Sequence, residues 1–265
     1  MNLSRPPPEV LAAFGATGGP TRQPGGQGHA WRADDIILKP CGDPAEAAWV
    51  AEVLAGLAPT PRFRVATPVP AVGGGWVVSG WHAWRVIAGE PDPRRCDEVL
   101  DVAEAFHAAI AGLARPAFLD SRDDPWSYGD RVAWGDLPPP AGDLIERLAS
   151  RRRPLNRPAQ VIHGDLLGNV LFATGLPPAV IDWPVYFRPA LWAQAIVVVD
   201  AVTWYGAPDD RLRRPRHPDW GQLLVRALMY RIATNEGMRR AGRPAREREG
   251  EYRRIVDLAL RTVRA

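Results

Sequence analysis

The pattern of hydrophobic and polar positions changes character along the chain. The first part alternates short apolar runs with turns rich in glycine and proline, which predicts short β-strands. The second half carries apolar residues at helical spacing. Strands followed by helices predict an α+β fold of two lobes, the first rich in β-structure and the second mainly helical. We expect helices at residues 97–114, 143–151, 189–204, 219–240 and 246–263, and loops at 120–126 and 135–140.

One further helix is predicted in the first part, beginning at Pro44. Asp43 is a favoured N-cap, and proline suits the first helical position. At about 100° per residue, Glu46 lies in the apolar stripe that contains Trp49, whereas Glu52 points to the other side. Glu46 is therefore the glutamate expected on the packed face. The alternative is a first-turn glutamate that the helix dipole favours.

Residues 23–40 are predicted to form three strands joined by turns, the first turn being rich in glycine. Glycines in a turn let backbone N–H groups approach a phosphate closely, because they carry no Cβ, although such a turn alone is a weak signal. This turn leads to the strand of Lys39, the single lysine among 33 basic residues. A lysine kept where arginine is used elsewhere indicates that a compact ammonium is needed there.

A second hairpin is predicted between residues 69 and 81, with its turn at Gly73–Gly75. Its second strand, residues 76–81, is expected to leave the first lobe. We therefore place the lobe boundary near Gly80, which gives a first lobe of residues 1–80 and a second lobe of residues 81–265. Residues 84–87 are expected to add a further strand.

The strongest chemical signal is the segment from Val161 to Trp183. Two apolar runs separated by a turn with glycine and proline predict a β-hairpin there. Asp165 and Asn169 lie on the loop that enters the hairpin, and Asp182 follows it, so closing the hairpin brings three oxygen-bearing side chains together. Mg²⁺ is commonly held by one or two carboxylates plus substrate phosphates. The strands are expected at residues 170–172 and 179–181, with 173–178 as the turn.

The order His-Gly-Asp165, Asn169, a hairpin and Ile-Asp182-Trp resembles the catalytic and metal-binding segments of the aminoglycoside phosphotransferase and choline kinase-like family. These small-molecule kinases have a protein-kinase-like fold. The resemblance implies an ATP- and Mg²⁺-dependent phosphotransferase that moves the γ-phosphoryl group to a hydroxyl of a small metabolite. Asp165 is then the catalytic base, and Asn169 and Asp182 are the metal ligands.

The resemblance also implies a nucleotide site in the first lobe. The glycine-rich turn would cover the nucleotide, the lysine would hold its phosphates, and a helical glutamate would pair with that lysine. The strand that leaves the lobe would contact adenine through its backbone. The residues so implied are Gly25, Gly26, Gly28, Lys39, Glu46, Ser79 and Trp81.

The chain departs from the family pattern at two places. Asp165 and Asn169 are four positions apart, where the family spacing is five, so the loop is expected to take a tighter path through Gly168. Family members often place an aspartate about where Trp192 stands, and the nearest helical carboxylate here is Asp200, two turns later. These departures motivate an alternative: a nucleotide-binding, pseudokinase-like regulatory or scaffold protein without turnover.

Two histidines could be mistaken for metal ligands or proton-transfer groups. His107 and His163 have no cysteine or histidine partner at metal-ligand spacing. We expect His107 to be a core or buttressing histidine rather than a ligand, and His163 to brace the catalytic loop.

Composition further limits the class of protein, its location and its partners. The content of 46% hydrophobic and 24% charged residues is typical of globular proteins. Only two cysteines, Cys41 and Cys96, occur, and the N-terminus lacks the apolar core of a signal peptide, so a cytoplasmic location is expected. The net charge is +3, but the C-terminal arginines alternate with glutamates as on a solvated helix face. We expect a small hydroxylated metabolite as partner, no nucleic acid and no membrane. The sequence carries no signal for an oligomeric state.

Overall fold

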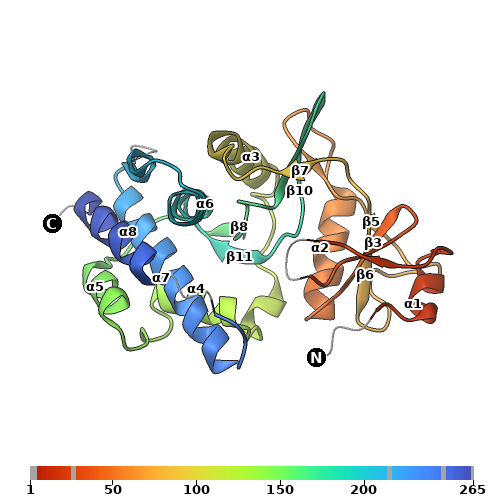
Figure 1. The fold of residues 1–265 in the computed structure, drawn as a ribbon, viewed down its shortest axis with the longest axis horizontal. Helices are drawn as coiled ribbons and strands as arrows, with labels where there is room; N and C mark the ends of the chain where they lie inside the picture. Colours follow the sequence, from red (N-terminus) through yellow and green to blue (C-terminus); the bar gives the residue numbers. More distant parts are fainter. Residues whose placement is uncertain (1–4, 25–27, 214–216, 246–248, 264–265) are drawn as a thin grey trace. The chain divides into compact units, whose positions relative to one another are not determined.

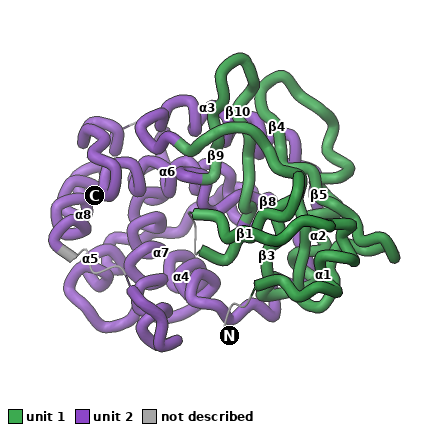
Figure 2. Tube along the Cα trace, turned by 45° about the vertical axis from the view of Figure 1, so that its right-hand side comes forward, with its two compact units in different colours: residues 1–91, 169–183 green, residues 92–168, 184–265 purple. Residues whose placement is uncertain are grey.

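The computed structural model describes residues 5–24, 28–213, 217–245 and 249–263 (Figure 1). The chain divides into two compact units (Figure 2). Unit 1 consists of residues 1–91 and 169–183, and unit 2 consists of residues 92–168 and 184–265. The hairpin that follows the catalytic loop thus belongs to the N-terminal unit, although it lies far downstream in the sequence.

Unit 1 contains a five-stranded sheet in the order β1-β2-β3-β6-β5. Three antiparallel strands are present around the predicted turns, but the first, β1, lies just before the expected stretch of residues 23–40. A short N-terminal helix, α1, places Val10 and Phe14 in the hydrophobic cluster on one face of this sheet. The bounds are α1 Pro8–Ala13, β1 Thr21–Arg22, β2 Trp31–Ala33, β3 Ile36–Pro40, β5 Pro68–Val69 and β6 Trp81–Arg85.

Alternation along β3 and β6 separates the core face of this sheet from the opposite face. Leu38 and Ala83 are opposite each other in the strand register, and both belong to the buried cluster with α1. The next pair in the register is Lys39 and His82. Because successive side chains of a strand point to opposite faces, Lys39 and His82 lie together on the face that α1 does not cover.

The predicted strand at residues 76–81 is wrong. Ser79 and Gly80 both have positive φ angles, 48° and 76°, and form a two-residue turn. The N–H groups of Val78 and Trp81 each donate to the carbonyl of the other at 2.9 Å. Such a turn reverses the chain, so the strand begins at Trp81, where the prediction ended it. The boundary expected near Gly80 therefore falls inside unit 1, which continues to Pro91.

Helix α2, Pro44–Gly56, confirms the predicted helix start. The Asp43 side chain accepts a hydrogen bond from the Ala45 N–H at 2.8 Å, and Pro44 is the first helical residue. Glu46 is half-buried and Glu52 is exposed, as the helical geometry predicted. The helix buries a face made of Ala47, Val50, Ala51 and Leu54.

The predicted hairpin after the catalytic loop is confirmed as strands β9, Val170–Ala173, and β10, Leu176–Val180. The turn is shorter than predicted, because β10 begins at Leu176 and a shift in register between Leu176 and Ala179 accommodates the two prolines. The hairpin is the centre of a second, four-stranded sheet of unit 1. Its outer strands are β4, Arg64–Val65, and β7, Glu90–Pro91.

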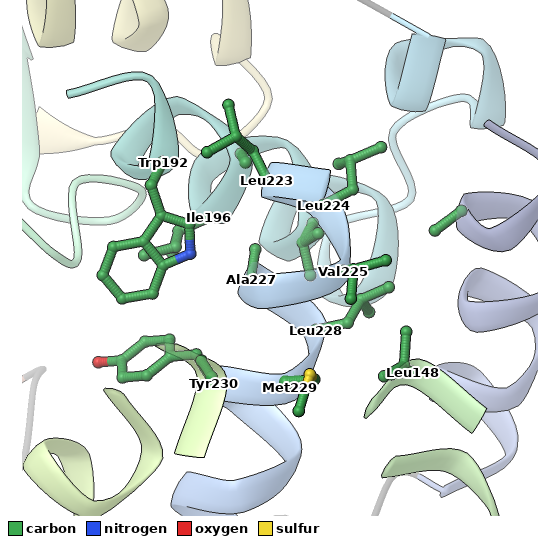
Figure 3. Close-up of a cluster of buried hydrophobic side chains, with 14 of the residues drawn as sticks. Leu148, Trp192, Ile196, Leu223, Leu224, Val225, Ala227, Leu228, Met229 and Tyr230 are labelled. Atoms are coloured by element: carbon green, nitrogen blue, oxygen red, sulfur yellow. The ribbon is translucent and has the colours of Figure 1, made fainter. Parts of the chain in front are cut away.

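Unit 2 is mainly helical and adds one small antiparallel sheet, β8 with β11. Its core is centred on α6 and α7, where Trp192 and Ile196 of α6 face the apolar side of α7, and the Tyr230 ring lies against Trp192 (Figure 3). The bounds are α3 Cys96–Ala109, η1 Ala117–Asp120, α4 Pro125–Trp134, α5 Asp143–Arg151, β8 Gln160–His163, β11 Val185–Arg188, α6 Ala190–Trp204, η2 Asp209–Arg213, α7 Trp220–Arg240 and α8 Glu249–Thr262.

Helix α4 was not predicted, and the loop expected at residues 120–126 in fact contains its start. Asp124 caps α4 by accepting from the N–H groups of Trp126 and Ser127, both at 2.9 Å. Gly135 ends the helix with a φ of 91°. The helix packs closely on α7, since a Cβ added at Gly129 would lie 2.2 Å from the Thr234 Oγ1 atom.

No helix within the described ranges combines the length and the apolar character needed to cross a membrane.

Candidate active site

Unit 1 brings together two of the predicted site residues. Lys39 of β3 and Asp182, which follows β10, are 143 positions apart in sequence, and the Lys39 Nζ atom donates to Asp182 Oδ1. The two side chains are 23% and 42% exposed. Asp182 has a φ of 49°, in the left-handed region that few non-glycine residues adopt. Such strain is concentrated at functional sites.

Asn169, another of the three predicted oxygen-bearing residues, lies at the same end of the hairpin as Asp182. The Asn169 carbonyl accepts a hydrogen bond from the Ile181 N–H at 3.0 Å, which places Asn169 beside the residue that precedes Asp182. In the described residues, no group of three or more His, Cys, Asp or Glu side chains could hold a metal ion. An amide oxygen and one carboxylate instead fit Mg²⁺, which keeps waters and takes further oxygens from phosphates.

His82 is a neighbour of this pair that the sequence did not indicate. It lies directly across from Lys39 in the strand register, and its ring packs edge-on against Trp84 at a centroid distance of 5.5 Å. Burial, together with the nearby Lys39 charge, lowers the pKa of His82 to about 4, against a smaller opposing effect of Asp182. The imidazole is therefore neutral at pH 7.

The structure links α2 to the segment after Asp182 through two tryptophans. The rings of Trp49 and Trp183 lie 5.6 Å apart between centroids and are tilted by 57°. Glu46 lies one turn before Trp49 and is half-buried, whereas the exposed Glu52 accepts a hydrogen bond from the Trp76 indole at 2.9 Å. Lys39 pairs with Asp182, and its pairing with Glu46 stays a prediction.

The predicted glycine-rich turn is described only in part. Gly25 and Gly26 lie outside the described residues. Gly28 has a φ of 71°, and its carbonyl accepts a hydrogen bond from Arg22 Nε at 2.8 Å. The Gln23 N–H donates to the Ala30 carbonyl at 2.9 Å, so the strands on either side of the turn are joined at its base.

Ser79 and Trp81 do not occupy the position that the resemblance assigned to them. Ser79 is in the two-residue turn that opens β6, and the Trp81 side chain is buried in the cluster beneath α1. The chain leaves unit 1 at Pro91, beyond the other end of β6. A proposed adenine contact at the exit of the unit therefore does not include Ser79 or Trp81.

In unit 2, two buried histidines fix the main chain of the catalytic loop. The Asp165 N–H donates to His163 Nδ1 at 3.1 Å, and the His163 N–H donates to His107 Nε2 at 3.0 Å. Burial, with a smaller effect of His163, lowers the pKa of His107 to about 3. His107 therefore stays neutral and accepts through Nε2, which supports the expectation that these histidines brace the loop.

The Asp165 side chain is held by a residue that was not predicted. Arg231 of α7 donates from Nη2 to Asp165 Oδ1 at 2.7 Å and from Nε to Asp200 Oδ1 at 2.8 Å. The same Nη2 atom also contacts Asp200 Oδ2. Burial alone lowers the pKa of Arg231, but Asp200 and Asp165 outweigh this effect and leave the pKa well above its usual value. The guanidinium is thus permanently charged.

The two glycines of the loop have different functions. A Cβ added at Gly164 would lie 2.3 Å from the Tyr186 ring, so this position requires glycine for space. The Tyr186 hydroxyl in turn lies 2.9 Å from that of Tyr230, the residue before Arg231. Gly168 has open space around it but a φ of 92°. Its backbone conformation allows the tighter path expected for the shortened loop.

One sequence signal could have revealed Arg231. The apolar stripe of α7 runs through Leu224, Ala227 and Leu228, and continuing its spacing leads to Arg231. An arginine in a buried stripe needs a carboxylate partner, because an unpaired buried charge is costly. The sequence therefore indicates a buried ion pair at this position, but it does not name the carboxylates.

Comparisons with known proteins place this geometry in a fold class. No protein-family model matches the chain, and no curated protein matches it. Solved structures match it along most of its length. A choline/ethanolamine kinase family protein from Mesorhizobium loti is 18% identical, and the match covers 95% of this chain and 90% of that one, with a TM-score of 0.58.

Two aminoglycoside phosphotransferases are similar in the same way. The apo form of a thermostable mutant of APH(4)-Ia is 16% identical, with 94% of this chain and 97% of that one covered and a TM-score of 0.55. A GDP and kanamycin complex of APH(2")-IIia is 14% identical, with 95% and 96% covered and a TM-score of 0.56. At these identities the likeness shows the fold: the chain has the α+β, kinase-like fold of these proteins, as predicted.

Proposed function

We propose that the protein is an ATP- and Mg²⁺-dependent phosphotransferase that moves the γ-phosphoryl group to a hydroxyl of a small metabolite. The observation that carries the proposal is the contact between Lys39 and Asp182. A phosphate-binding ammonium and a metal-binding carboxylate must lie close together, because a metal ion held by the carboxylate would neutralise the same phosphates that the lysine would bind. Here a strand and a hairpin from distant parts of the sequence bring them to one place.

Each residue has a defined task in this proposal. Lys39 binds the nucleotide phosphates, and Asn169 and Asp182 hold Mg²⁺. When bound, Mg²⁺ neutralises negative charge on the phosphates. Asp165 orients the acceptor hydroxyl and accepts its proton as the oxygen bonds to the γ-phosphorus, while ADP leaves with the electrons of the broken phosphorus–oxygen bond.

The fold neighbours support the nucleotide and the type of acceptor. Mutants of APH(4)-Ia form ternary complexes with ADP or AMP-PNP and hygromycin B, and APH(2")-IIia forms a complex with GDP and kanamycin. For this chain we infer a nucleoside triphosphate as donor and a small hydroxylated metabolite as acceptor. Both cysteines in the structure, Cys41 and Cys96, are free thiols, which suits the cytoplasm as the place of action.

Calorimetric titration with Mg·ATP tests the nucleotide half of the proposal. We expect binding to the wild-type chain and a loss of at least about tenfold in affinity on Lys39→Met or Asp182→Asn, because each removes a charge that faces the phosphates or the metal. Asp35→Asn is a matched control, since Asp35 also pairs with a basic residue of this sheet, Arg85. Absence of binding to the wild type would refute the proposal.

The spacing of four positions between Asp165 and Asn169 favours a second candidate, a nucleotide-binding scaffold without turnover. Single-turnover assays across a panel of hydroxylated metabolites discriminate the two. Transfer to any acceptor would support the enzyme. Intact Mg·ATP binding with no transfer to any acceptor would support the scaffold.

A further inference from the structure

Asp165 is fixed in the structure by two separate devices. Its main chain is held by His163, whose Nδ1 accepts the Asp165 N–H. Its side chain is held by Arg231, and that contact involves one carboxylate oxygen, Oδ1. The Asp165 side chain is still 42% exposed, so the carboxylate is anchored on one side and accessible to a substrate on the other.

Arg231 is itself immobilised. Asp200 accepts from both Nε and Nη2, a two-point contact that fixes the plane of the guanidinium. The Arg231 Cζ atom lies 5.1 Å from the centroid of the Trp204 ring and 5.0 Å from that of Tyr230. The Arg231 and Asp200 side chains are only 7% and 2% exposed. The guanidinium is therefore a rigid part of the interior rather than a surface group that a substrate would contact.

We propose that Arg231 is the positioning residue of the active site and that Asp200 acts on Asp165 through it. This inference rests on the proposed function and assigns two residues that the sequence motifs do not include. In this proposal, the Asp200 carboxylate on α6 does not contact the catalytic loop itself. It holds the Arg231 guanidinium, which in turn holds Asp165. Asp165, the catalytic residue, can then meet the acceptor hydroxyl with its carboxylate already oriented.

The arrangement also accounts for the departure at Trp192. Trp192 is fully buried and packs edge-on against Tyr186 and Tyr230, so it offers no carboxylate to the loop. Asp200 lies two turns further along α6, about 12 Å along the helix axis. A long arginine side chain from α7 fills that offset. In this chain the supporting carboxylate is therefore Asp200, and Arg231 is the cation between it and the loop.

The test uses a double variant, Arg231→Met/Asp200→Leu, which removes both buried charges together and so avoids leaving one of them alone. The assay is ADP release from Mg·ATP with water as acceptor. We expect kcat to fall about 10- to 100-fold, because a small misplacement of a reacting group is that costly. The KM for ATP should change by less than about threefold, since none of the hydrogen bonds and ring contacts of Arg231 within the described residues is with a proposed nucleotide-binding residue. Arg231→Lys keeps the charge but loses the two-point contact. Its kcat should therefore lie between those of the wild type and the double variant.

A readout specific to positioning comes from combining the variants with Asp165→Ala. If Arg231 acts through Asp165, the double substitution should cost no further activity once Asp165 is absent. A merely structural role would cost the same factor in both backgrounds. That result would overturn the proposal, as would a folded double variant whose kcat is within about threefold of the wild type.

A matched control lies on the same helix. Arg226 is also buried, and its Cζ atom lies 4.9 Å from the centroid of the Trp134 ring, but it donates to main-chain and glutamine oxygens only, among the described residues. Arg226→Met should leave kcat unchanged.

Hydrogen exchange separates this proposal from the proposed function. Amides of residues 163–168 should exchange faster in the double variant than in the wild type, whereas Arg226→Met should leave them unchanged. If the wild type bound no Mg·ATP, the proposed function would fail, but the loop exchange would still decide the role of Arg231. Unchanged exchange in the double variant would refute the positioning role.

Discussion

Each unit of the molecule carries a charged contact at its proposed functional residues, and the two contacts are of different kinds. In unit 1, Lys39 and Asp182 form a single pair whose side chains are partly exposed. In unit 2, Asp165 belongs to a bridge that continues through Arg231 to Asp200 and is buried at its centre. The Lys39–Asp182 pair can separate into water at little cost, whereas the buried Arg231–Asp200 pair cannot.

The difference follows what each side chain does in the proposed function. Exposed ion pairs contribute about 0–1 kcal/mol to stability, so Lys39 and Asp182 can exchange each other for phosphate and metal. Removing one partner from a buried pair costs about 3–5 kcal/mol. Arg231 and Asp200 form such a pair, so the guanidinium that contacts Asp165 keeps one orientation in the proposed reaction. The partners that must bind and release ligands are held weakly, and the group that must stay in place is held strongly.

The largest expected effect comes from removing the group that the bridge holds. Asp165→Ala should lower kcat by about 10²- to 10⁴-fold, the usual contribution of a general base, with little change in ATP affinity. Asp182→Ala should instead lower both kcat and ATP affinity, because Asp182 is a proposed ligand of the metal ion. Steady-state kinetics with a calorimetric ATP titration check the contrast. A kcat for Asp165→Ala within about threefold of the wild type would show that Asp165 is not the base.

The second prediction concerns stability and breaks the bridge at its centre. Arg231→Met alone should lower the free energy of unfolding by about 3–5 kcal/mol, because it leaves the Asp200 carboxylate buried without its guanidinium. Urea denaturation measures the loss. The double variant Arg231→Met/Asp200→Leu should recover most of it, and equal losses in the two variants would contradict a buried ion pair.

The third prediction uses the histidine that supports the catalytic loop. The pKa of His107 is about 3 in the folded chain against 6.5 for the free side chain. Between these values the unfolded chain binds the additional proton, so stability falls as the pH is lowered. From about pH 6.5 to about pH 5 the loss due to His107 should be about 2 kcal/mol.

His107→Gln retains a hydrogen-bond acceptor near the position of Nε2 without the titration. Urea denaturation at a series of pH values should therefore show a shallower decline for this variant than for the wild type. The same slope in both proteins would mean that His107 is not buried in its neutral form.

The smallest effect is expected at the exposed pair. Lys39→Met should change the free energy of unfolding by no more than about 1 kcal/mol, and added salt should reduce the difference further. The same variant should lose most of its ATP affinity, which is the sharpest contrast with Arg231. A stability loss comparable to that of Arg231→Met would show that Lys39 is a structural cation.

Local signals in the sequence explain what could be predicted. Asp43 before Pro44 fixes the start of α2, and the glycine and proline turn after Ala173 indicates the hairpin. The same kind of signal was present for α4, where Asp124 precedes Pro125 and Gly135 closes the helix. That helix was missed because its buried face includes Ser127 and Gly129, which interrupt the apolar pattern, although its N-cap resembles that of α2.

What the sequence could not show depends on contacts between distant segments. Ser79 and Gly80 were placed in a strand, because a serine–glycine pair forms a reversal only when both residues adopt positive φ angles. The bridge from Asp165 to Asp200 joins a loop and two helices, and no local pattern relates Arg231 to either aspartate. The fold class could be predicted from motifs, and so could a bracing role for His163. The contact of Arg231 with the Asp165 side chain could not.

The inserted hairpin has a consequence for synthesis of the protein. All strands of the five-stranded sheet lie within the first 85 residues, so this sheet can form early as the chain leaves the ribosome. Strands β4 and β7 have to wait for β10 and β9, which are made only after the first half of unit 2. Until then their edges are unpaired and open to wrong partners. Lys39 therefore meets Asp182 late, and the contact between them cannot form in a nascent chain before the loop of residues 163–168 has been made.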